Sequence, residues 1–66
     1  MKVLVIGSGA REHAIVKALH RDPAVTAVHC APGNAGISAD AELHAIDMTN
    51  SAAITKLAQD LNVDLV

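Results

Sequence analysis

The 66-residue sequence contains no phenylalanine, tyrosine or tryptophan. Any hydrophobic core must therefore be built from valine, isoleucine, leucine, alanine and methionine, and stacking of aromatic rings on nucleic-acid bases is excluded. Basic residues are also few, since five lysines and arginines stand against seven aspartates and glutamates and are scattered along the chain. This distribution offers no basic stripe, so we expect no nucleic-acid partner.

Cysteine and long apolar runs are scarce as well. The single cysteine, Cys30, cannot form an intramolecular disulfide, which excludes a disulfide-stapled secreted mini-protein and favours a reducing compartment. The apolar run from Val3 to Ile6 is far too short for a signal peptide or a membrane span. We therefore expect a cytoplasmic protein with no membrane partner.

The first half of the sequence alternates strand and helix patterns. Residues 3–6 are continuously apolar and rich in β-branched side chains, as in a strand buried on both faces. Apolar residues recur at helical spacing over residues 11–20, and the Asp-Pro pair at 22–23 stops the predicted helix. Residues 25–30 are rich in strand formers and predict a second strand.

The second half continues the alternation. Residues 42–46 predict a short third strand, residues 47–50 can cap a helix start, and residues 53–61 carry an apolar stripe at helical spacing. Asn62 can adopt the left-handed conformation that ends a helix. Residues 63–66 resemble the beginning of another buried strand, inside which the sequence stops, so we expect a truncated domain.

This order of elements predicts parallel β-α-β units in an open, Rossmann-like α/β sheet. Ligands in such sheets bind beyond the carboxyl ends of the strands. The turn at residues 7–10 and the loop at residues 31–36, Ala-Pro-Gly-Asn-Ala-Gly, would both lie on that edge. The two segments together form the candidate site.

The glycines of the turn fit two interpretations. Gly7 and Gly9 let the backbone turn tightly and present N–H groups to an anion, but they would equally serve a plain strand-to-helix connection. A dinucleotide fingerprint needs a third glycine where Glu12 stands and an acid at the end of the second strand, so an NAD-dependent oxidoreductase is disfavoured. No Lys-Ser or Lys-Thr follows at Walker A spacing.

Three side chains of the first helical turn are candidates for ligand contact. Arg11 can hold a phosphate or carboxylate bidentately, or it can simply lie in solvent. Glu12 stabilises the helix start through the helix dipole. His13 can contact a ligand or serve as a polar packing residue.

Four histidines suggest a metal site, but their spacing argues against one. His13 and His20 lie about 10 Å apart along a helix axis. His29 and Cys30 point to opposite faces of a strand, and His44 has no ligand partner nearby in the sequence. We therefore expect no metal site, and no catalytic residue either, because no nucleophile with a base and an orienting acid is visible.

Two strings in the sequence together resemble one family. Met1 to Ala14 (MKVLVIGSGAREHA), followed by Ala31 to Gly36 (APGNAG), is similar to the amino-terminal domain of the glycinamide ribonucleotide synthetase (phosphoribosylamine-glycine ligase) family. The resemblance extends to the final Asn-Val-Asp-Leu-Val. The family usually has glycine where this chain has Ala10, and we expect position 10 to lie in the first helical turn, where alanine is harmless.

The resemblance implies an ATP-grasp ligase of de novo purine synthesis, which joins glycine to 5-phosphoribosylamine using ATP with Mg or Mn and releases ADP and phosphate. Residues 1–66 would open its pre-ATP-grasp domain and contribute to the phosphoribosylamine side of the site. The ATP-grasp and C-terminal domains would lie outside this segment, which alone would be inactive and bind no cofactor. The alternative is a non-catalytic α/β module that binds a nucleotide or an anion. The candidate substrate-binding residues are Gly7, Ser8, Gly9, Arg11, Glu12, His13, Pro32, Gly33 and Asn34.

Overall fold

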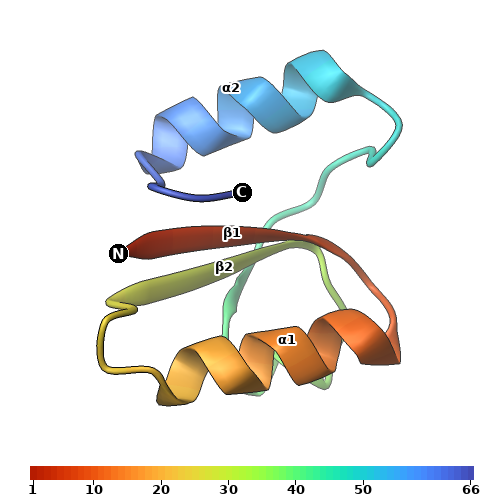
Figure 1. The fold of residues 1–66 in the computed structure, drawn as a ribbon. Helices are drawn as coiled ribbons and strands as arrows, with labels where there is room; N and C mark the ends of the chain where they lie inside the picture. The colour runs from red at the N-terminus through yellow and green to blue at the C-terminus, as the bar shows by residue number, and fades with distance from the viewer.

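The computed structural model describes residues 1–66 as an open parallel sheet with one helix on each side (Figure 1). This arrangement confirms the predicted α/β class. None of the helices is both long and apolar enough to cross a membrane. In chain order the elements are β1 (Lys2–Gly7), α1 (Ala10–Arg21), β2 (Ala27–Pro32), a 3-10 turn η1 (Ile37–Ala39), β3 (Glu42–Leu43) and α2 (Ser51–Leu61).

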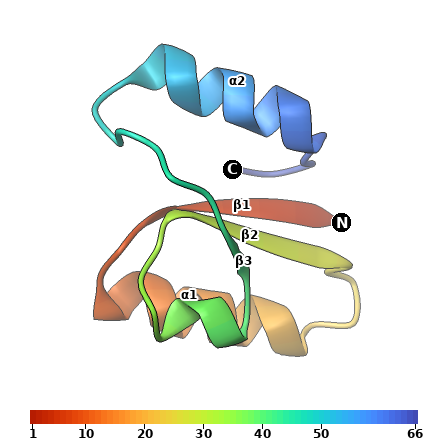
Figure 2. The same ribbon diagram turned by 180° about the vertical axis from the view of Figure 1, so that it is seen from behind.

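β1 is the first strand of a three-stranded parallel sheet whose order is β1-β2-β3. On one side it pairs in parallel with β2 along its whole length, and β3 continues the sheet beyond β2 (Figure 2). On the other side Leu65 forms a parallel bridge with Val3, and its carbonyl oxygen accepts a hydrogen bond of 2.9 Å from the N–H of Leu4. The chain thus proceeds outward from β1 to β3 and then returns to the opposite edge of β1. Such a reversal of strand order marks the usual ligand position of open α/β sheets, outside the carboxyl ends of the strands at the point of reversal.

The core is small and lies between α1 and the sheet. Val16 of α1, Cys30 of β2 and Ile37 of η1 are fully buried against one another. Because these three residues come from three different elements, their contact fixes the 33–36 loop to the helix that follows β1. No polar or charged residue is buried.

The predicted ends of α2 are confirmed. The side chain of Asn50 accepts a hydrogen bond of 3.1 Å from the N–H of Ala53, as an N-cap does. Asn62 ends the helix in the left-handed conformation, with φ 54° and ψ 46°. Asp22 ends α1 in an extended conformation directly before the proline.

Three strand predictions need correction. β2 begins at Ala27 instead of Val25, because the Val25 N–H is used in a turn to the Asp22 carbonyl oxygen, and β2 extends to Pro32. β3 covers only residues 42–43 of the predicted 42–46. Residues 63–66 form a single bridge instead of a buried strand, and Leu65 and Val66 are exposed.

Replacing Ile37 with alanine should lower the free energy of unfolding by about 2–5 kcal/mol, because a fully buried aliphatic side chain is lost. Ile15→Ala is the matched control, since Ile15 is 46% exposed and should cost less than about 1 kcal/mol. Urea unfolding followed by far-ultraviolet circular dichroism measures both. Equal losses in the two variants would show that the core is not centred on Ile37.

Candidate functional site

The carboxyl ends of β1 and β2 lie side by side, where Gly7 pairs with Pro32. Gly7 has a φ of 150° and Gly33 a φ of 71°, which are backbone conformations that side chains other than glycine rarely adopt. A Cβ at Gly7 would overlap the side chain of Glu12, and one at Gly33 would overlap Leu43. Both glycines are therefore required by backbone conformation and by close packing.

Hydrogen bonds join the two predicted segments. The Gly33 N–H donates to the Gly7 carbonyl oxygen at 3.0 Å, and the amide nitrogen Nδ2 of Asn34 donates to the Ser8 carbonyl oxygen at 2.6 Å. The Cys30 thiol also donates to the Gly7 oxygen, with Sγ 3.4 Å away. The turn after β1 and the loop after β2 thus form one surface, which we call the corner: residues 7–12 with 32–34.

Glu12 folds back over the turn. It occupies the third position of α1, and its Oε2 accepts a hydrogen bond of 3.0 Å from the N–H of Gly9. This contact satisfies one amide of the helix start and places negative charge at the positive end of the helix dipole. The sequence suggested that the N–H groups of this turn would be free to bind an anion. The structure differs at Gly9, whose N–H is already hydrogen-bonded to Glu12.

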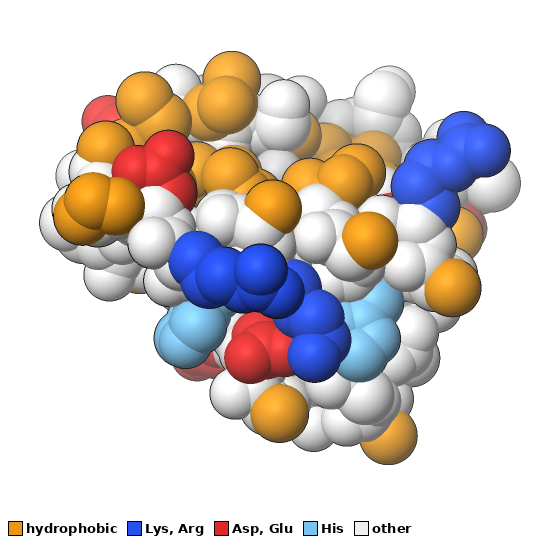
Figure 3. All heavy atoms as spheres, turned by 60° about the horizontal axis from the view of Figure 1, so that its bottom comes forward, with side chains coloured by type: hydrophobic (Ala, Val, Ile, Leu, Met, Phe, Trp, Pro, Cys, Tyr) orange, Lys and Arg blue, Asp and Glu red, His pale blue; other side chains and the backbone are white.

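Other donors of the corner have no partner within the chain. The backbone N–H groups of Ala10, Arg11 and Glu12 make no hydrogen bond, as is normal for the first turn of a helix. The side chain of Arg11 is exposed and forms no ion pair. Ala10 is the first residue of α1, and Asn62 is the one non-glycine residue with positive φ, so the expectation for position 10 is confirmed. Figure 3 shows basic, acidic and histidine side chains gathered on the face that carries α1.

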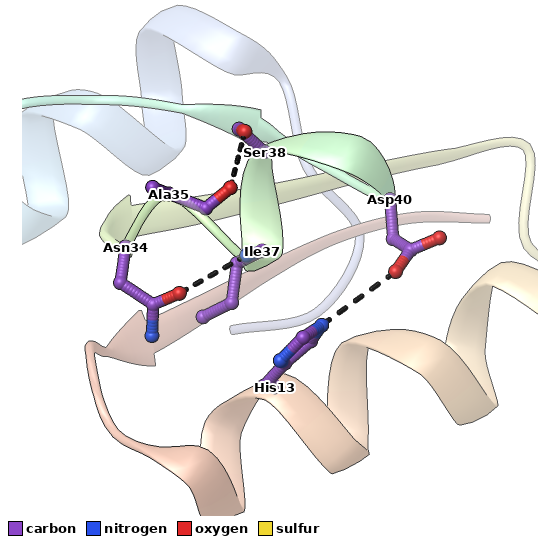
Figure 4. Close-up of polar contacts among 6 residues, drawn as sticks. All are labelled: His13, Asn34, Ala35, Ile37, Ser38 and Asp40. Atoms are coloured by element: carbon purple, nitrogen blue, oxygen red, sulfur yellow. Dashed lines mark hydrogen bonds and ion pairs between the residues drawn. The ribbon is translucent and has the colours of Figure 1, made fainter.

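His13 supports the loop after β2 from below (Figure 4). Its ring lies so close to Gly36 that a Cβ there would come within 3.2 Å of Cε1. Its Nε2 is buried without a hydrogen-bond partner, and the 3.7 Å that separates it from Oδ2 of Asp40 is too long for a hydrogen bond. This geometry matches the packing interpretation of His13.

Asn34 is held at both ends of its side chain. Besides the bond from Nδ2 to Ser8, its Oδ1 accepts a hydrogen bond of 3.1 Å from the N–H of Ile37, which anchors the loop to the buried core (Figure 4). Ser38 adds a bond of 2.6 Å from its hydroxyl to the Ala35 carbonyl oxygen. Asn34 therefore acts as a brace between the turn and the loop.

The corner is an open surface. The chain has two hollows, one between α2 and residues 62–66 and one along β1 beside α1. Neither hollow is lined by residues 8–12 or 32–34. A ligand at the corner would thus be covered on one side only by these 66 residues.

Two of the histidines meet in the fold although they are far apart in the sequence. No ligand partner for His44 was predicted nearby in the sequence, but its Nε2 lies 3.0 Å from Nδ1 of His29. The two residues are 15 positions apart in the sequence, and only the parallel pairing of β2 with β3 brings them together. The usable signal was the alternation of Glu42 and His44, which puts both on one face of a strand.

Gly33→Ala should lower the free energy of unfolding by roughly 1–3 kcal/mol from the left-handed backbone alone, with a further loss from overlap with Leu43. Gly36→Ala is the comparison, because Gly36 has an ordinary helical φ of −68° and its added Cβ would need His13 and Asn34 to shift only slightly, so it should cost less. Chemical denaturation measures both variants. If Gly33→Ala costs nothing, the backbone at Gly33 does not have the conformation described.

Burial raises the pKa of the Cys30 thiol, and the charge of Glu12 acts in the same direction. Because the folded-state pKa lies above the unfolded one, the neutral thiol contributes stability that is present at neutral pH and is lost as pH rises above about 9. The free energy of unfolding should therefore fall more steeply between pH 8 and 10.5 in the parent chain than in Cys30→Ala. Identical slopes would contradict the burial of this thiol.

Comparison with known proteins identifies similar sequences over the whole length of this chain. Residues 1–66 match the family described as "Phosphoribosylglycinamide synthetase, N domain". The phosphoribosylamine-glycine ligase of Streptomyces coelicolor is 62% identical over 66 residues, and that of Mycobacterium tuberculosis strain H37Rv is 52% identical. The enzyme of Corynebacterium ammoniagenes is 47% identical over 68 residues.

In each of these alignments the whole of this chain is covered, and it spans 16% of the relative's length. The matches cover every residue of this chain, at identities of 47–62%. The chain therefore belongs to the phosphoribosylglycinamide synthetase N-domain family.

Proposed function

We propose that this chain is the amino-terminal part of the pre-ATP-grasp domain of a phosphoribosylamine-glycine ligase. The complete enzyme would be an ATP-dependent carbon-nitrogen ligase of purine biosynthesis that acts in the cytoplasm and joins glycine to 5-phosphoribosylamine. The family membership and the names of the relatives support this assignment. The observation that carries the role of this segment is the joining of the two loops by Asn34 and Ser8 outside the carboxyl ends of β1 and β2.

The phosphate of 5-phosphoribosylamine would bind at the start of α1. The unpaired N–H groups of Ala10, Arg11 and Glu12 offer hydrogen bonds where the helix dipole favours negative charge. The exposed guanidinium of Arg11 can add a bidentate, charge-assisted contact to the same phosphate.

Glu12 restricts where that phosphate can lie. Its carboxylate is held over the turn by the Gly9 N–H, so a phosphate directly above Gly9 would meet like charge. The phosphate therefore belongs on the Arg11 side of the corner. The carboxylate is suited instead to accept a hydrogen bond from a ribose hydroxyl or from the amine of the ribosylamine.

The Pro32-Gly33-Asn34 segment would lie against the ribose. Gly33 brings bare backbone to this surface, while both polar ends of Asn34 are already engaged, so Asn34 holds the loop in position. His13 acts in the same way from beneath the loop. Ser8 would add its hydroxyl to the surface that contacts the ribose, and its carbonyl oxygen accepts the hydrogen bond from Asn34 that holds the loop.

The remaining machinery would come from other domains of the same protein. The corner offers a single carboxylate, Glu12, which is engaged by the Gly9 N–H, so it does not fit a metal-bound nucleotide, which needs oxygen ligands free for Mg or Mn. When bound elsewhere in the enzyme, ATP supplies the phosphoryl group that activates the glycine carboxylate for attack by the amine.

In the complete enzyme, Arg11→Ala should raise the KM for 5-phosphoribosylamine about tenfold or more, because a charged hydrogen bond contributes roughly 1.5–3 kcal/mol. The KM values for ATP and glycine should change little. Lys17→Ala, which removes another exposed charge of α1 that lies outside the corner, is the matched control. Steady-state kinetics with each substrate varied in turn measures these values. Equal rises for all three substrates would mean that Arg11 supports only the fold.

A further inference from the structure

The pairing of β2 with β3 gathers two imidazoles and a carboxylate on one face of the sheet. His29 lies directly opposite Glu42 in the register, and the N–H of His44 donates to the Cys30 carbonyl oxygen at 3.0 Å. Because alternate residues of a strand share a face, Glu42 and His44 project to the same side as His29. Cys30 and Leu43 project to the other side, into the core beneath α1.

The three side chains converge at short distances. Nδ1 of His29 lies 3.0 Å from Nε2 of His44 and 3.4 Å from Oε2 of Glu42. All three ligand atoms lie within 4.8 Å of one another. The two rings are tilted by 47° with their centroids 5.1 Å apart, so they meet by their nitrogens and are not stacked.

These distances suit a tetrahedral metal ion. Zinc bonds of about 2.0–2.2 Å to nitrogen and oxygen place neighbouring ligand atoms roughly 3.3 Å apart, which is close to the two separations from His29. The His29 side chain is only 12% exposed, whereas the Glu42 side chain is 68% exposed and has room to adjust. Two histidines and one glutamate are a recurrent ligand set for zinc, with the fourth position open to water.

We propose that His29, Glu42 and His44 form a zinc-binding site. This inference goes beyond the ligase activity and does not rest on it, since none of the three residues belongs to the corner. The bound ion would also tie β3 to β2, which are otherwise joined by only two residue pairs. A metal bound in the folded state alone stabilises that state.

The test is isothermal titration of the metal-free full chain with zinc chloride. The parent chain should bind one zinc ion. His44→Gln and His29→Gln should each weaken zinc binding at least about tenfold. Even the loss of a residue that only hydrogen-bonds to a metal ligand can have an effect of this size. His20→Gln is the control, because His20 is an exposed histidine of α1 outside the cluster, and its binding should equal that of the parent.

A second variant, Glu42→Gln, keeps the test decisive if the histidine variants unfold. The Glu42 side chain is 68% exposed and contributes little to the core, and circular dichroism can verify that the variant is folded. It should also weaken zinc binding, and zinc should raise the unfolding temperature of the parent chain more than that of the variant. Three results would each overturn the proposal: no binding to the parent chain, unchanged binding by Glu42→Gln, or an equal loss in His20→Gln.

Discussion

The carbonyl oxygen of Gly7 is the point on which the candidate site depends. It ends β1 and accepts hydrogen bonds from the Gly33 N–H and from the Cys30 thiol, so the loop after β2 must follow the turn after β1. Ile37 fixes the far end of that loop in the core, and Asn34 braces its middle. The result is a corner of backbone over which the Glu12 side chain folds, and the proposed sugar phosphate would bind beside that side chain.

Local features of the sequence predicted much of this fold. The helix ends at Asp22, Asn50 and Asn62 follow from side-chain and backbone chemistry that acts within a few residues, and the structure has them as expected. The joining of the two glycine-containing segments also followed, because parallel strands end at one edge of the sheet. The limits of the strands could not be predicted from the sequence. Pairing with a neighbouring strand, and not the strand propensity of the residues, decides where β2 and β3 begin and end.

Specific side-chain contacts could not be predicted from the sequence either. Nothing local indicates that Glu12 folds back onto Gly9, because the same residue would be an ordinary surface acid if the turn had another shape. The meeting of His29 with His44 depends on the register of two strands, and a shift of one residue would send one of them to the opposite face. β2 therefore serves three purposes at once, with Cys30 in the core, His29 on the far face and Pro32 at the corner.

The contact of Leu43 with the loop joins the weakest strand of the sheet to the candidate site. β3 has two residues, and the methyl groups of Leu43 lie directly beneath Gly33. Edge strands of this length open transiently far more often than the global unfolding rate, and each opening would withdraw the support under Gly33. Amide hydrogens at the loop and at β3 are accordingly expected to exchange with solvent as one cooperative unit, while those of β1 exchange only when the whole domain unfolds.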